Sequence, residues 1–264
     1  MGQEIERAAG PLEGLYRSGA LSDDTKDALL YVPGAVEKIA AGLGERSAGN
    51  ELLLALILVD DSTSIAMRIK EIRFGHNLLL EALRAEASDA DIQVHTRALN
   101  RGVLSPYETL ANATPLSERN YSGSYLVPKT PLYLQSLLTL GTVMVKAQEE
   151  EERGVKVRTF TLIITDDADN NSGNVGASHV RTLATDMLEF STNHLVAGMG
   201  VGEHVDYREV FSSMGIPRNW IFTPGTSVDE LRRKFRKLAR SLALAASSEA
   251  AFLQLAPAPP PDSR

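Results

Sequence analysis

The sequence predicts a doubly wound α/β fold, in which a mainly parallel sheet carries helices on both faces. Two apolar runs, 52–59 and 155–165, are each followed by adjacent acidic residues, as expected of buried strands that end in a polar loop. Segments with a helical spacing of apolar residues separate the strand-like segments. This alternation is typical of a parallel sheet with helical connections. The 264 residues, 43% of them hydrophobic, suffice for one substantial core without a second domain.

The first half of the chain is expected to supply three strands. Pro33-Gly34 separates two short helical patterns, and a polar turn follows the apolar run at 52–59. The elements predicted here are helices at 25–32 and 35–43, a buried strand at 52–59, a helix at 65–87, a strand at 92–98 and a short strand at 103–104. Residues 105–129 follow no regular pattern, and a connection of this length inside a compact domain is usually functional.

The second half is expected to complete the sheet and end in an amphipathic helix. Thr130-Pro131 is a favourable helix start, since Thr is a good N-cap and Pro suits the first helical position. Ser227 and Glu230 form a capping-box pattern before an apolar stripe. The predicted elements are a helix at 130–152, strands at 155–165 and 194–199, helices at 179–190 and 207–214, a short strand at 220–222 and a last helix from 227.

Composition and charge exclude several classes of protein. We expect an N-terminal helical extension (1–49), an α/β domain (50–246) and a flexible tail rich in Ala and Pro (247–264). The net charge of −7 gives no general attraction to nucleic acid or anionic membranes, and the absence of Cys excludes thiolate chemistry. Neither a signal peptide nor a bilayer-spanning run is visible, so a cytoplasmic protein without membrane contact is expected.

The segment Asp60-Asp61-Ser62-Thr63-Ser64 is the most informative motif, because it directly follows the first buried strand. Side chains alternate in direction as a chain leaves a strand, so Asp60, Ser62 and Ser64 can point the same way. One carboxylate and two hydroxyls suit a small hard divalent cation, and the lack of nearby Cys or His argues against zinc or copper. Ligand sites in open α/β sheets lie at the carboxyl ends of strands, where this motif is predicted.

Two further residues occupy matching places in the predicted fold. Thr130 stands at the start of a helix, and Asp166 ends the second buried strand. Together with Asp60, Ser62 and Ser64 they resemble the von Willebrand factor A (vWA) family and its metal-ion-dependent adhesion site. Locally, 129–133 is similar to the family's Thr-Pro-Leu segment, and 162–170 is similar to its strand end T-D-G-x-D-N.

The resemblance covers roughly residues 50–245 and implies a doubly wound domain with a bound Mg²⁺ or Mn²⁺, in preference to Ca²⁺. In the family an acidic residue of a partner protein commonly completes the metal shell. Carried over by position, the metal ligands would be Asp60, Ser62, Ser64, Thr130 and Asp166. The chain also resembles bacterial-type standalone intracellular members, which often serve as adaptors for AAA+ ATPases or act in stress-response and defence gene clusters.

The chain departs from the family pattern in two places. Asp167 stands where family members usually carry Gly, and Pro128-Lys129 precedes the Thr where Gly-Gly is common. The first change adds a negative charge and removes backbone freedom, and the second places a cation near the site. Neither removes a ligand.

The expected function is metal-dependent protein binding rather than catalysis. A shell of three hydroxyls and two carboxylates leaves room for water and one external anion, and the bound cation keeps enough positive charge to attract a carboxylate. The alternatives left open are a metal-dependent phosphohydrolase or phospho-acceptor that uses Asp60, and a metal-free vWA scaffold. A haloacid-dehalogenase-type phosphatase would need a second Asp at position 62, where Ser62 stands.

Two other patterns receive ordinary structural interpretations. The glycines at 198, 200 and 202 lack the helix and acidic residue that follow a dinucleotide-binding loop, and are interpreted as a strand end near the site. The six basic residues between 232 and 240 are interpreted as the solvated face of the last helix, because no aromatic platform accompanies them.

Overall fold

The computed structural model describes residues 2–86, 91–225 and 227–255, and its centre is one six-stranded sheet. The strand order is β3-β2-β1-β4-β5-β6. All neighbouring pairs are parallel except β2 and β3, which are antiparallel. The strands are β1 (Glu51–Val59), β2 (Asp91–Ala98), β3 (Gly102–Thr109), β4 (Lys156–Thr165), β5 (His194–Gly200) and β6 (Ile221–Phe222). The doubly wound α/β prediction is confirmed.

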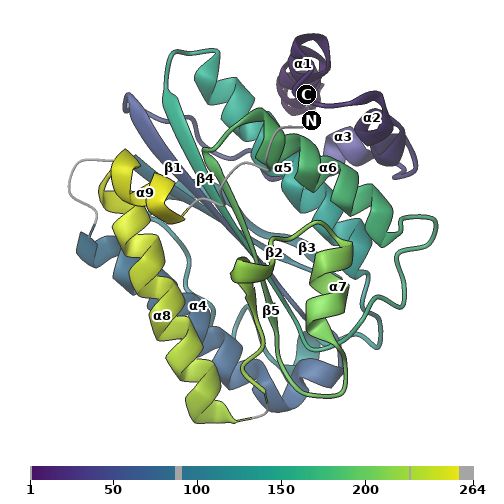
Figure 1. Ribbon diagram of the computed structural model, residues 1–264, viewed down its shortest axis with the longest axis vertical. Helices are drawn as coiled ribbons and strands as arrows, with labels where there is room; N and C mark the ends of the chain where they lie inside the picture. Colours follow the sequence, from purple (N-terminus) through teal and green to yellow (C-terminus); the bar gives the residue numbers. More distant parts are fainter. Residues whose placement is uncertain (1, 87–90, 226, 256–264) are drawn as a thin grey trace.

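Helices cover both faces of this sheet (Figure 1). On one face α4 packs against α8, and on the other α5 packs against α6 and the sheet. The helices of these layers are α4 (Ile69–Glu86), α5 (Leu132–Glu151), α6 (Ala177–Phe190), α7 (Tyr207–Ser213) and α8 (Val228–Ser247). Because every residue of β1 from Leu52 to Val59 is fully buried, a continuous apolar run is what this central strand requires.

The N-terminal residues form a further helical layer on the outside of α5 and α6 (Figure 1). They contain α1 (Gly2–Ser18), α2 (Asp23–Leu30) and α3 (Ala35–Ala40). The sequence predicted α2 and α3 but not α1, which carries Pro11 and three glycines. Tertiary contacts stabilise α1, because Arg7 donates to Glu149 of α5 and to the backbone oxygen of Gly44. Packing of this kind readily overrides a low helix propensity.

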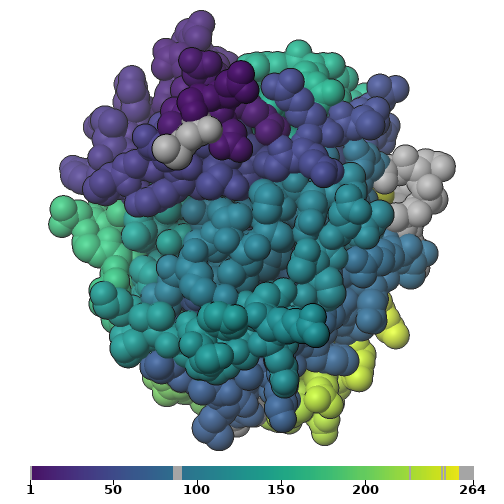
Figure 2. Space-filling view, turned by 180° about the vertical axis from the view of Figure 1, so that it is seen from behind, coloured from purple at the N-terminus to yellow at the C-terminus, as the bar shows by residue number. Residues whose placement is uncertain are grey.

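The strand expected at 103–104 is longer than predicted and extends over the whole of β3. Because β3 lies at the edge of the sheet, Pro106, which has no N–H to donate, breaks no hydrogen bond to a further strand. Beyond β3 the chain spreads across the back of the molecule, below the N-terminal helices (Figure 2). This segment contains η2 (Gly123–Tyr125), a 3₁₀ helix of one turn.

The beginning of the predicted tail is also ordered. Residues Glu249–Leu255 form helix α9, whose Phe252 is fully buried. The indole nitrogen of Trp220 donates to the backbone oxygen of Leu255 at 3.1 Å, which fixes the end of this helix. The flexible tail predicted from 247 therefore does not begin there, and its remainder, 256–264, lies outside the described residues.

Candidate metal site

The predicted site lies at the carboxyl ends of β1 and β4, two neighbouring strands in the middle of the sheet. Asp60 directly follows β1, and Asp166 directly follows β4. The chain connects outward from β1 to β2 and from β4 to β5, so the order of the sheet reverses between β1 and β4. Ligand sites of open α/β sheets occur at such switch points, because the loops there diverge and leave a crevice.

Four of the five predicted residues are connected by hydrogen bonds. Asp60 Oδ1 accepts from the backbone nitrogen of Ser62 at 2.7 Å. The hydroxyls of Ser62 and Ser64 lie 2.8 Å apart, and Ser64 Oγ donates to Asp166 Oδ1 at 2.7 Å. The alternation of side chains after β1 therefore has the predicted result. Asp61 points elsewhere and accepts from Arg101 Nε at 3.1 Å.

Thr130 is buried, but its side chain meets Asn170 rather than the other four residues within the described part of the chain. Asn170 Oδ1 accepts from the backbone nitrogen of Thr130 at 2.7 Å, and Asn170 N donates to the Thr130 carbonyl at 3.0 Å. These two bonds tie the start of α5 to the loop after β4. That loop leaves the Thr130 hydroxyl with only a distant contact, 3.5 Å from Asn170 Nδ2.

The predicted N-cap role of Thr130 is not observed. Helix α5 starts at Leu132, with Pro131 as its N-cap residue. Its first free amides are satisfied from the loop after β4: Asp169 Oδ1 accepts from Tyr133 N at 3.1 Å, and Ser172 Oγ accepts from Leu134 N at 2.9 Å. A side chain from elsewhere in the chain can cap a helix as a local residue does. The Thr130 hydroxyl therefore has no capping task.

The two site carboxyls are buried, and His204 lies close enough to Asp166 to favour its charged form. Burial raises the pKa of Asp60, against the hydrogen bonds from Ser62 and Thr165. Burial also raises the pKa of Asp166 to about 6, with the hydrogen bond from Ser64 opposing the rise and repulsion from Asp60 and Asp167 adding to it. Among the described residues, neither carboxyl forms an ion pair with Lys or Arg. A bound cation would supply the missing positive charge.

The donor set fits a hard divalent cation only if the hydroxyls take part. In the described part of the chain, no three acidic or His side chains gather in a way that could hold a metal ion. The oxygens present are two carboxyls and the hydroxyls of Ser62, Ser64 and Thr130, and oxygen ligands of this kind suit Mg²⁺ and Mn²⁺. Ser64 is exposed while Asp60 is fully buried, so the site opens to the surface at one end.

Several residues that hold the site were not foreseen. Thr165 Oγ1 donates to Asp60 Oδ2 at 2.7 Å, and Tyr121 donates to the Asp60 carbonyl. The Tyr207 hydroxyl donates to the Asp166 carbonyl at 2.7 Å. Its ring crosses Gly200 at the end of β5, where a Cβ would lie only 1.9 Å from Tyr207 Cγ. The glycine pattern around 200 was the only signal in the sequence for this packing.

The two departures from the family pattern are accommodated. Asp167 has an ordinary negative φ, since every described residue with positive φ is a glycine, so no left-handed backbone is needed there. Its Oδ1 accepts from Ala168 N at 2.8 Å, which closes the turn after β4. Lys129 is exposed, and its carbonyl accepts from Asn100 Nδ2 at 2.9 Å. Both residues therefore border the site on its solvent side.

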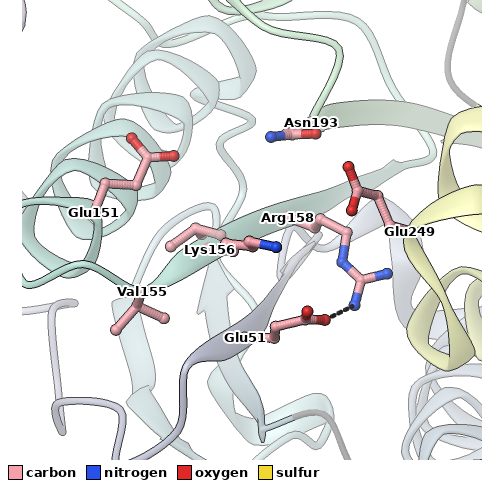
Figure 3. Close-up of a pocket in the computed structure, with 8 residues that line it drawn as sticks. Glu51, Glu151, Val155, Lys156, Arg158, Asn193 and Glu249 are labelled. Carbon is pink, nitrogen blue, oxygen red and sulfur yellow. Dashed lines mark ion pairs between the residues drawn. The ribbon is translucent and has the colours of Figure 1, made fainter.

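A separate pocket of about 270 Å³ lies at the opposite, amino-terminal edge of the sheet (Figure 3). Arg158 of β4 points into it and pairs with Glu51 at 3.8 Å, and Lys156, Glu151 and Glu249 line it from other sides. Its acidic and basic side chains are nearly balanced, so it shows no preference for an anion or a cation. It is not connected with the site at the other end of the strands.

Comparison with solved structures shows the fold. The chain resembles the pilus adhesin SpaC from Lactobacillus rhamnosus GG with a TM-score of 0.51 and 11% identity, over 76% of this chain and 31% of that one. It also resembles proximal thread matrix protein 1 from the mussel byssus (TM-score 0.44, 16% identity, 74% of this chain and 48% of that one). A third similar structure is the SpRpn10 VWA domain (TM-score 0.42, 12% identity, 70% of this chain and 93% of that one).

These likenesses concern the fold alone, and the chain spans less than half the length of the first two proteins. No protein-family profile matches the sequence, and no curated protein is similar to it in sequence. Among the described helices, none has the length and apolar character needed to cross a membrane.

Proposed function

We propose that this protein is a binding module in which a Mg²⁺ or Mn²⁺ ion, held by Asp60, Ser62, Ser64, Thr130 and Asp166, captures an Asp or Glu side chain of a partner protein. The observation that supports it most is the pair of buried carboxyls at adjacent strand ends, joined through two serine hydroxyls and forming no ion pair with Lys or Arg among the described residues. Such an arrangement is costly without a cation.

The surroundings support capture of a partner rather than a closed structural site. Ser64 and Thr63 are exposed, and Met67 beside them exposes 84% of its surface. Only two carboxyls would surround the ion, so a divalent cation would keep the positive character that attracts an external carboxylate. An exposed Met next to the ion offers an apolar contact to the residues flanking that carboxylate.

The burial of Asp60 argues against its use as a phosphate acceptor. It is fully buried, Oδ1 accepts from Ser62 N, and Oδ2 accepts from Thr165 Oγ1, so its carboxyl is held away from solvent. A nucleophile must instead be able to reach the reacting phosphorus. Incubation with acetyl phosphate and with a panel of phosphate esters tests this alternative, and labelling of Asp60 or turnover would favour it.

Calorimetric titration with Mg²⁺ and Mn²⁺ tests the metal site itself. We expect one site in the wild type and no binding in Asp60→Asn or Thr130→Ala. Asp27→Asn, which makes the same change of charge at an exposed position of α2, serves as the matched control and should bind as the wild type does. No heat of binding in the wild type would favour a metal-free scaffold.

Capture of partners then tests the function. Wild type and Thr130→Ala are immobilised and exposed to native lysate with Mg²⁺ or with EDTA. We expect proteins retained only by the wild type and only with Mg²⁺. Retention that is indifferent to both the metal and the substitution contradicts the proposal.

A further inference from the structure

Helix α8 presents a concentrated row of cations to solvent. It carries six basic residues between 232 and 240: Arg232, Arg233, Lys234, Arg236, Lys237 and Arg240. The helix is strongly amphipathic, because Leu231, Phe235, Leu238 and Leu242 are buried on its inner side. Arg233, Arg236, Lys237 and Arg240 are exposed and follow one another at helical spacing along the outer side.

Most of these cations form no ion pair with an acidic side chain among the described residues. Within the described residues, the ion pairs of this helix are limited to Arg232 with Glu71 of α4, at 3.8 Å. The guanidinium groups of Arg232 and Arg236 also lie over the ring of Phe74, at 5.1 and 6.0 Å from its centroid. The exposed Arg233, Arg236, Lys237 and Arg240 form no ion pair with the acidic residues of α4 in the part of the chain that the structure describes. The local field along this side of the helix is therefore positive, which attracts an acidic ligand.

An apolar groove runs beside the row, between α8 and α4, which lie side by side on one face of the sheet (Figure 1). One hollow of about 350 Å³ is lined by Ala82, Ala85, Arg240, Ala243 and Leu244. A second of about 320 Å³ is lined by Arg233, Arg236, Lys237, Arg240, Ser241 and Leu244. The first hollow lies between α4 and α8, the second lies along α8 itself, and Arg240 and Leu244 line both. The groove thus has an alanine-rich floor, cations along one wall, and Leu244 with 57% of its surface exposed.

We propose that this groove, named here the α4/α8 groove, binds an acidic amphipathic helix of a partner protein. Small side chains on the floor let a second helix approach closely, and Leu244 offers a contact to its apolar stripe. The row of Arg and Lys complements carboxylates that flank such a stripe. A concave groove between two helices suits a rod better than a planar membrane, and the apolar floor does not suit a nucleic acid backbone.

The test uses a synthetic acidic amphipathic peptide as a probe. It has ~18 residues, with Leu at helical spacing and Glu at the adjacent positions. A scrambled peptide of the same composition is the control for shape, and a DNA duplex and vesicles containing phosphatidylserine are the controls for general polyanion binding. Binding to the full chain is measured by fluorescence anisotropy at two salt concentrations. We expect the amphipathic peptide to bind at least tenfold more tightly than the scrambled one.

Two variants locate the binding. Lys237→Glu/Arg240→Glu reverses two exposed charges of the groove and should weaken binding of the peptide about tenfold or more, since two attractive charge pairs are lost and repulsion replaces them. Leu244→Ser should also weaken binding of the peptide. The matched control Lys26→Glu/Arg119→Glu makes the same change of charge at exposed positions elsewhere and should bind as the wild type does.

Circular dichroism confirms that each variant is folded before binding is compared. Equal binding of the two peptides, or equal weakening by both double variants, would overturn the proposal. So would tighter binding of the DNA or the vesicles than of the amphipathic peptide.

Discussion

Asp166→Asn is expected to stabilise the metal-free protein and to abolish its response to Mg²⁺. The carboxyl of Asp166 is buried beside Asp60, and its pKa rises from an ordinary 3.8 to about 6. An acid whose pKa is raised on folding stabilises the protein below its unfolded pKa and loses that contribution as pH rises through its folded pKa. The metal-free wild type should therefore lose stability between about pH 4 and pH 6 and stay weakened at pH 7.

The size of the effect follows from this pKa. At pH 7 the ionised carboxyl costs at most about 3 kcal/mol, and screening by solvent at the open end of the site reduces this to about 1 to 2 kcal/mol. Asn removes the charge and keeps an oxygen that can accept from Ser64 Oγ, the bond that Asp166 makes at 2.7 Å. For a chain of this size the melting temperature in EDTA at pH 7 should rise by about 2 to 8 °C.

Thermal unfolding in EDTA and in excess Mg²⁺ measures both effects. Mg²⁺ at 100 times its dissociation constant should stabilise the wild type by about 2.7 kcal/mol and the Asn variant hardly at all. Asp27→Asn, a change of the same charge at an exposed position of α2, should shift stability by less than about 0.5 kcal/mol. If Asp166→Asn is less stable than the wild type in EDTA at pH 7, the inference that the charge of Asp166 destabilises the metal-free protein is refuted.

Three further predictions follow from the same structure. Because protons compete with the metal for Asp166, Mg²⁺ affinity should fall about tenfold from pH 7 to pH 5 by calorimetry, and a constant affinity would contradict the pKa assigned to this carboxyl. Gly200→Ala places a Cβ against the Tyr207 ring and should cost at least about 1 to 3 kcal/mol in urea unfolding, so an unchanged midpoint would contradict this packing. Glu150 is fully buried and accepts from Lys146 Nζ at 2.6 Å, so Glu150→Ala should lower the free energy of unfolding by about 3 to 5 kcal/mol in the same assay. Glu152→Ala, at an exposed position, is the control, and similar losses of stability in both variants would refute the role of the buried pair.

The strands could be predicted from the sequence because this sheet is buried on both faces. Leu52 to Val59 needs apolar side chains at every position, which makes the run visible without knowledge of its neighbours. Helix α1 could not be predicted, since Pro11 weakens its local preference and its stabilising ion pair is with Glu149, far along the chain. The extent of β3 was likewise hidden by Pro106, which only an edge strand tolerates.

The candidate site also has residues that the sequence could predict and residues that it could not. Asp60, Ser62 and Ser64 are close in sequence, so the alternation of a strand end was enough to bring their side chains together. The hydroxyl of Tyr207 that holds the Asp166 carbonyl comes from α7, three elements after β4, and no local pattern indicates it. Contacts of this kind depend on how distant segments pack, which a single sequence does not reveal.

The most direct test of the central claim is a crystal structure of the protein grown or soaked with Mn²⁺, with anomalous scattering used to locate the ion. The account predicts one strong peak at the carboxyl ends of β1 and β4, bounded by Ser62, Ser64 and Asp166. Crystals in saturating Mn²⁺ that show no peak there, or a peak only at another place on the surface, would contradict it.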